Sequence, residues 1–256
     1  MAGISLSGLS ASVSYQIEQS QGAKKLEQFQ KDPALKREIA YFQEKAPNIK
    51  SVDDLFKDRR LMGVILSAYG LDSEMQFMGR IKKVMTSNLE DPSSLANKLR
   101  DPKFKALAKD FNLDLFGVSQ LKISDFTNKI ISKYKQNEYD KALGNENPAL
   151  RETVYLKRNI GNVKNAYDIL GDPVLRKVIT ATFNIPPQLA VQEIETQKRV
   201  IDSRVDIKKL SDTKYVDGLI KRYLTTVDAQ GSQSASATSW QNQLISGAGG
   251  RLSLLA

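Results

Sequence analysis

One stretch of this sequence occurs twice, and this repetition limits what the chain can fold into more than any other feature does. Residues 56–71 read FKDRRLMGVILSAYGL, and residues 170–185 read LGDPVLRKVITATFNI. Matching positions keep a single offset (175 − 61 = 114) across the stretch. The apolar positions follow the i, i+3, i+4, i+8 spacing of a helix with one buried face. These anchors are Leu61, Val64, Ile65 and Tyr69 in the first copy, and Leu175, Val178, Ile179 and Phe183 in the second.

Each copy also carries residues that begin and end a helix. Asp58 and Asp172 stand three residues before the first anchor, where a carboxylate accepts hydrogen bonds from the free N–H groups of a starting helix. Pro173 follows at the first helical position, where its missing N–H costs nothing. Gly70 and Asn184 come directly after the aromatic anchor, and both residue types tolerate the left-handed backbone that ends helices. The sequence therefore predicts one helix per copy.

The rest of the chain is punctuated in the same way, which indicates an all-α fold. Five of the eight prolines follow Asp or Asn, a typical start of a helix, and no alternating β pattern separates them. They are Pro33, Pro92, Pro102, Pro148 and Pro173. Residues 118–143 are expected to form a long polar helix.

The likeness extends downstream from residues 101–111 to residues 212–223, so the repeated unit is expected to be a multi-helix module of about sixty residues. The two copies are then joined by long helices. The predicted organisation is a flexible N-terminal tail, a first module with a leading helix, a helical connector, a second module and a low-complexity C-terminal tail. These parts cover residues 1–25, 26–112, 113–164, 165–227 and 228–256.

The composition argues against most catalytic designs. The chain has no cysteine and no histidine, which excludes disulfides, thiolate or imidazole catalysis and most zinc sites. Adjacent acidic pairs, Asp53-Asp54 and Glu90-Asp91, stand at expected helix starts, where capping explains them. The segment GAGG at 247–250 lacks the strand and the Lys-Ser/Thr of a phosphate loop. We therefore expect no catalytic residue, metal ligand or cofactor, although an enzyme that uses carboxylates alone stays open.

The net charge of +9 raises the alternative of a basic module that binds nucleic acid or an anionic surface. Lysine and arginine are, however, mixed with acidic residues along the chain, and no block of like charges occurs. Solvated helix faces explain that pattern better, so a nucleic-acid partner is not favoured. No apolar run is long enough for a transmembrane helix, and the first residues do not resemble a cleaved secretory signal.

Both ends combine small polar residues with thinly spaced apolar ones. Residues 1–25 carry no charge before Glu18, and the segment GSQSASATS near the other end is of low complexity. Such ends bury too little to order alone, and they could pair with each other or with partner chains. The candidate partner contacts are Leu6, Leu9, Val13, Trp240, Leu244 and Ile245.

The repeated pattern LxDPxLRxxIxxxF, followed by Gly or Asn and then Leu or Ile, resembles a bacterial family of domain-of-unknown-function type whose genes are often found beside flagellar genes. The likeness rests on residues 55–71 and 170–185, and it continues into 101–111 and 212–223. The first copy departs from it, since Arg59 stands where the pattern has proline. The resemblance implies no activity and no site residues, but it does imply a flagellum-associated role.

The ends agree with that implication, because exported axial and junction proteins of flagella are similar in having uncleaved, weakly apolar ends. The leading hypothesis is therefore a non-enzymatic structural or protein-interaction protein of flagellar assembly. Its partners would be flagellar components or a second copy bound through the termini. It would be located in the flagellum after uncleaved export, or in the cytoplasm.

Overall fold

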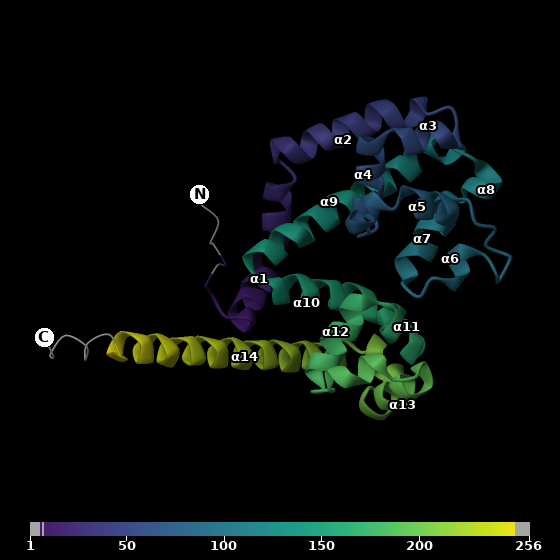
Figure 1. The fold of residues 1–256 in the computed structure, drawn as a ribbon. Coiled ribbons are helices and arrows are strands. Elements are labelled where there is room, and N and C mark those ends of the chain that lie inside the picture. Colours follow the sequence, from purple (N-terminus) through teal and green to yellow (C-terminus); the bar gives the residue numbers. More distant parts are fainter. Residues whose placement is uncertain (1–5, 7, 249–256) are drawn as a thin grey trace, which may run out of the picture.

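The computed structural model describes residue 6 and residues 8–248. These residues form α-helices and short 3-10 helices, and no β-strand occurs among them. The predicted all-α fold is thus confirmed (Figure 1).

The α-helices, in chain order, are α1 (Ala11–Phe29), α2 (Pro33–Lys45), α3 (Val52–Lys57), α4 (Arg59–Ala68), α5 (Met78–Met85), α6 (Leu95–Lys98), α7 (Pro102–Phe111), α8 (Leu113–Phe116), α9 (Ser124–Glu146), α10 (Pro148–Asn159), α11 (Ala166–Gly171), α12 (Pro173–Thr182), α13 (Ile194–Arg204) and α14 (Thr213–Ala248). The 3-10 helices are η1 (Ala46–Asn48), η2 (Asp72–Gln76), η3 (Ser119–Lys122), η4 (Ile160–Asn162), η5 (Pro187–Val191) and η6 (Ile207–Ser211).

The repeated stretches become α4 and α12, and both helices begin on the expected aspartate. The Asp58 carboxylate accepts a hydrogen bond from the backbone N–H of Leu61 at 2.9 Å. The Asp172 carboxylate accepts from the N–H groups of Val174 and Leu175 at 2.9 and 3.0 Å. Each aspartate thereby satisfies donors that a helix start leaves free.

The two helices also end alike. Gly70 and Asn184 have φ of 64° and 48°, the left-handed region that glycine and asparagine tolerate. The next residue then donates its N–H back to the carbonyl five residues earlier, with a distance of 2.8 Å in both copies. These bonds join Leu71 to Leu66 and Ile185 to Thr180. The local structure of the two stretches is therefore the same, while duplication of the whole module stays a prediction.

The anchors face the interior as their spacing requires. Seven of them are buried, whereas Phe183 is half-buried and packs against the guanidinium of Arg222 at 4.8 Å. The buried anchors are Leu61, Val64, Ile65, Tyr69, Leu175, Val178 and Ile179.

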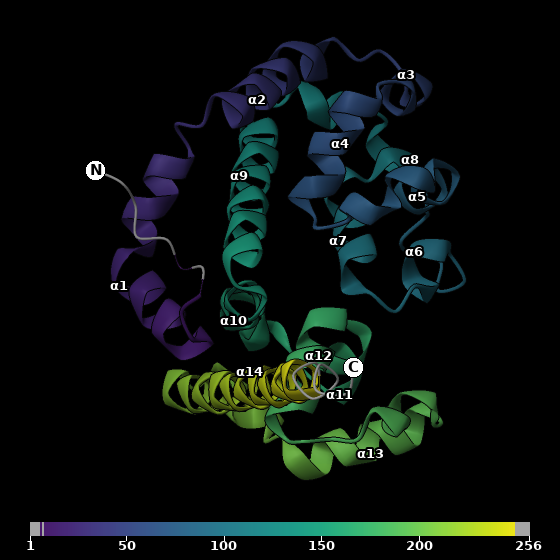
Figure 2. The same ribbon diagram turned by 60° about the vertical axis from the view of Figure 1, so that its left-hand side comes forward.

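Two hydrophobic cores form, and α9 belongs to both. The first core unites α2 to α8 with the beginning of α9, from Phe126 to Tyr134. The second core unites α1 and α10 to α14 with the later part of α9, through Tyr139 and Leu143. Figure 2 shows α9 running between α1 on one side and α4 on the other. The segment 113–164 is therefore divided between the cores and is not a separate connector.

The N-terminal end differs from its prediction. Where a flexible tail was expected up to residue 25, α1 begins at Ala11 and packs on the second core, because Ala11 and Tyr15 find apolar partners there. At the other end, the backbone of α14 continues helically to Ala248 through the segment predicted as a low-complexity tail. Figure 1 shows the later part of α14 projecting from the body of the molecule.

Two internal helices begin later than predicted. The Asp91 carboxylate closes a tight turn by accepting from Ser93, so α6 begins only at Leu95. The helix expected over 118–143 begins at Ser124, after η3. No helix in the described part of the chain combines the length and apolarity needed to cross a membrane.

Candidate interaction surface at the paired terminal helices

The two terminal helices are joined by one carboxylate. Asp228 of α14 accepts hydrogen bonds from the backbone N–H groups of Ala11 and Ser12 at 2.6 and 3.2 Å, and from Ser12 Oγ at 2.6 Å. The first turn of α1 contains no acidic residue of its own. Asp228 supplies the negative charge that the helix dipole favours there, so one terminal helix caps the other.

The contact of α1 with the body combines apolar and polar side chains. Ala11 and Tyr15 are buried in the second core, and Ile17, Leu26 and Phe29 pack against it. The buried hydroxyl of Ser14 has no hydrogen-bond partner among the described residues. The phenol of Tyr139 on α9 donates to Glu18 at 3.0 Å. Burial raises the pKa of the Glu18 carboxyl, although the bond from Tyr139 opposes this change. The second core and this hydrogen bond together hold α1 on the body.

The candidate partner contacts of the N-terminal segment divide into two groups. Leu6 is fully buried in the second core, and its N–H donates to Glu146 Oε2 at 3.2 Å, so it is part of the fold. Leu9 and Val13 are 39% and 43% exposed, and these two side chains are accessible to a partner.

The candidate contacts of the C-terminal segment lie on the projecting part of α14. Trp240, Leu244 and Ile245 fall within the helix, but only the backbone of residues 232–248 is described. At the helical rise of 1.5 Å per residue, residues 229–248 extend roughly 30 Å beyond Asp228. Figures 1 and 2 show no other helix alongside this part of α14. The end of α14 therefore does not pack against another described helix.

The cavity that most resembles a catalytic site built from carboxylates lies between α7, α10, α11 and α12 and has a volume of about 460 Å³. Asp172 and Asp168 line it, yet Asp172 caps α12 and Asp168 forms a capping box with Asn165. Nearby Asp101 caps α7, and burial raises the pKa of its carboxyl. These carboxylates all serve as helix caps, and the described residues contain no group of acidic side chains able to hold a metal ion.

Many basic side chains are paired with carboxylates. The Arg60 guanidinium donates to Glu38 at 2.9 Å, and Lys82 pairs with Asp53 at 2.5 Å. Arg158 donates two hydrogen bonds to the Asp140 carboxylate. The cationic partners come from several helices across both cores, a distribution that does not form a single basic stripe.

Sequence reasoning missed Asp228, Glu18 and Tyr139 as the residues that fix α1. Their partners lie more than one hundred residues away in the chain, so no local pattern reveals them. The one local signal was that the first turn of α1, which begins at Ala11, contains no acidic residue.

Comparison with known proteins agrees with the family suggested by the repeat. Residues 68–216, more than half of the chain, match a family described as protein of unknown function (DUF1217). The chain is similar to the crystal structure of protein AGR_C_984 from Agrobacterium tumefaciens, with 28% identity and a TM-score of 0.75, over 87% of this chain and 96% of that one. No curated protein matches. Neither description assigns an enzymatic activity. The chain belongs to the DUF1217 family.

Proposed function

We propose that this protein is a non-enzymatic structural or protein-interaction component of bacterial flagellar assembly. The observation that carries the proposal is that Asp228 joins the terminal helices at the body, while α14 continues outward from that point. The capped start of α1 and the projecting end of α14 together form the terminal surface.

The sequence of the projecting segment explains why it would need a partner. Residues 229–239 read AQGSQSASATS, and glycine and serine are poor helix formers. Isolated helices of this length are marginal in water even with better sequences. A partner surface that buries one face of the segment would stabilise it.

The partner contacts follow from spacing and exposure. Trp240, Leu244 and Ile245 stand at i, i+4 and i+5 in the sequence, on one side of a helix. Leu9 and Val13 are exposed near the Asp228 junction. These residues are the ones that we assign to partner binding.

The flagellar part of the proposal is supported by the family resemblance and by the nature of the chain ends. The similar Agrobacterium tumefaciens protein matches the fold over nearly its whole length, so the same scaffold occurs in both proteins.

Isolated flagellar structures provide the test. A tagged full-length chain is expressed in its native cell in place of the untagged one, and flagellar basal structures and filaments are purified and probed for the tag. A second chain ends at Gly231, and a third carries Arg199→Ala on the exposed side of α13. We expect the full-length chain and the α13 variant to co-purify, and the shortened chain to be lost.

Thermal unfolding of the shortened chain serves as its control, because the described members of both hydrophobic cores all lie before Gly231. Absence of the full-length chain from all flagellar fractions contradicts the flagellar assignment. Normal incorporation of the shortened chain contradicts the role of α14.

A further inference from the structure

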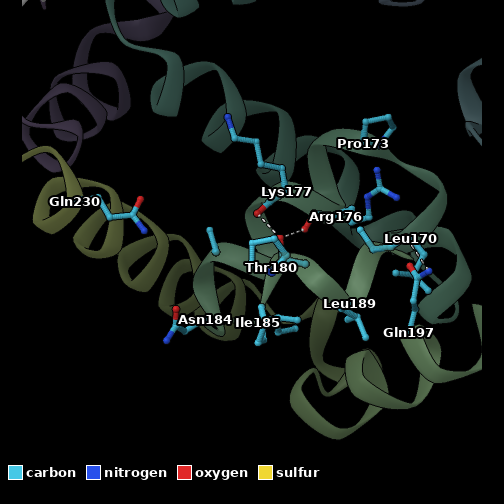
Figure 3. Close-up of a pocket in the computed structure, with 14 residues that line it drawn as sticks. Leu170, Pro173, Arg176, Lys177, Thr180, Asn184, Ile185, Leu189, Gln197 and Gln230 are labelled. Atoms are coloured by element: carbon cyan, nitrogen blue, oxygen red, sulfur yellow. Dashed lines mark hydrogen bonds between the residues drawn. The ribbon is translucent and has the colours of Figure 1, made fainter. Parts of the chain in front are cut away.

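A groove lies along α12 at the edge of the second core. Its volume is about 510 Å³, and it lies between α12, η5 and the beginning of α13, with Gln230 of α14 at one edge. Figure 3 shows Arg176, Lys177, Thr180 and Asn184 along its α12 side. The residues of α12 that line the groove are spaced three to four positions apart, so they lie on one side of the helix.

The corresponding face of α4 is covered by a helix. At the offset of 114 residues, Ala181 and Asn184 correspond to Ser67 and Gly70. Ser67 Oγ donates to Glu138 Oε1 of α9 at 2.7 Å and accepts from Asn137 Nδ2 at 3.1 Å.

The same helix continues across the end of α4. A side chain added at Gly70 would meet Asn137 Oδ1 at 3.7 Å, and Lys133 Nζ lies 4.2 Å from the ring centre of Tyr69. In the first core, α9 thus covers the two positions of α4 that correspond to Ala181 and Asn184 at the groove.

Corresponding residues of α4 and α12 also differ in how deeply they are buried. Met62 and Leu66 of α4 are fully buried, whereas their counterparts Arg176 and Thr180 are half-buried at the groove. In the described part of the chain, α14 packs against α12 near Phe183, through Arg222, and it borders the groove with Gln230. The change from two apolar residues to Arg176 and Thr180 fits a face that is not sealed within its own chain.

We propose that this groove binds an amphipathic, acidic α-helix of a partner protein. The apolar part of the groove is formed by Leu170, Ile185 and Leu189, which suits the buried face of such a helix. No carboxylate among the described residues pairs with Arg176, and the adjacent Lys177 pairs with Glu152. An acidic side chain on the incoming helix supplies the missing charge for Arg176, just as Glu138 supplies an acceptor for Ser67 on α4.

The occupant is assigned to another protein because the terminal helices of this chain are engaged elsewhere. The body of α1 is docked between α9, α10 and α14, and α14 leaves the body after Asp228. The groove adjoins the terminal surface at Gln230, but its assignment does not depend on the flagellar proposal.

The test uses helical peptides of about twenty residues, displayed on phage and selected on the immobilised full-length chain. Two groove variants are prepared, Arg176→Glu to reverse the unpaired charge and Ala181→Trp to fill the space. The matched control is Arg199→Glu, which reverses an exposed arginine on α13 outside the groove. All three are checked for wild-type thermal unfolding, and either folded groove variant is sufficient for the measurement.

Selected peptides are then synthesised and their affinities are measured by fluorescence anisotropy. We expect acidic, amphipathic sequences whose Kd rises about tenfold or more with each groove variant, while the control stays within about twofold. Peptides without acidic residues, or binding that the groove variants leave unchanged, would overturn the proposal. So would a change in the sedimentation of the full-length chain caused by the groove variants alone, since that outcome assigns the groove to a second copy.

Discussion

The phenol oxygen of Tyr155 lies 2.5 Å from Oδ2 of Asp172, the aspartate that begins α12. Tyr41 holds Asp58 in the same way at 2.8 Å, and both pairs are separated by 17 residues in the chain. In each case one carboxylate oxygen caps its helix and the other accepts the tyrosine hydroxyl. These bonds fasten α2 to the start of α4 and α10 to the start of α12.

Removal of the Tyr155 hydroxyl should cost more than removal of the Tyr41 hydroxyl. Asp172 is only 2% exposed, so Tyr155→Phe leaves a buried carboxylate oxygen without its donor, at a cost of about 2 kcal/mol. Tyr41→Phe is the matched control, because Asp58 is better exposed and water replaces the donor. Urea unfolding of both variants measures the difference. Equal losses would show that burial of Asp172 does not set the cost.

A methyl group at Gly171 should disturb the contact between the two halves of the molecule. A Cβ at this position would lie 2.5 Å from the backbone carbonyl oxygen of Arg100, which cannot move aside as a side chain could. We expect Gly171→Ala to destabilise the protein by about 1–3 kcal/mol in urea unfolding.

The control for this variant is Gly218→Ala, an exposed position in α14 where the added methyl meets nothing within 4 Å. There the higher helix propensity of alanine should stabilise the protein by about 0.5–1 kcal/mol. A loss of stability at both glycines would point to a general effect of the substitution and not to the contact with Arg100.

Asp228→Ala should loosen α1 while leaving the cores folded. The substitution removes the acceptor for the first N–H groups of α1, and loss of such a cap costs about 1 kcal/mol. Hydrogen exchange should therefore speed up in residues 11–20 and remain unchanged in α4 and α9. Asp217→Ala, which removes only an exposed pairing with Lys157, is the control. Unchanged exchange in α1 would contradict the capping role.

The stability that Asp110 contributes should depend on pH. Burial alone would raise the pKa of its carboxyl, but hydrogen bonds from Lys129, Lys133 and Tyr69 outweigh burial, so this pKa lies below its ordinary value of 3.8. A carboxyl with a lowered pKa stabilises the fold above its unfolded pKa, and this contribution is lost as the pH falls through the folded pKa.

Asp110→Asn should accordingly lower the free energy of unfolding by about 1–2 kcal/mol at neutral pH, because two lysines and a tyrosine lose a charged acceptor. The gap between wild type and variant should narrow below pH 3.8. Urea unfolding at pH 7 and near pH 3 measures both gaps. A gap of the same size at both values would show that the charge of Asp110 plays no part.

Much of the local structure of this protein could be predicted from short-range sequence signals. The aspartate caps at 58 and 172 and the left-handed residues Gly70 and Asn184 act within one turn of their own helix, so neighbouring residues suffice to indicate them. The burial of the anchors followed from helical periodicity for the same reason. The all-α class and the family were accessible at this level.

The tertiary structure decided how these helices meet. Asp228 caps the start of α1. Tyr41 and Tyr155 donate hydrogen bonds to the aspartates that begin α4 and α12. Gly171 allows the backbone carbonyl of Arg100 to approach from the other half of the molecule. In the same way, α9 covers Ser67 and Gly70 of α4, while the corresponding Ala181 and Asn184 line a groove. Hydrogen bonds and packing between distant residues depend on where the chain returns in space, and a periodicity within one helix carries no information about that.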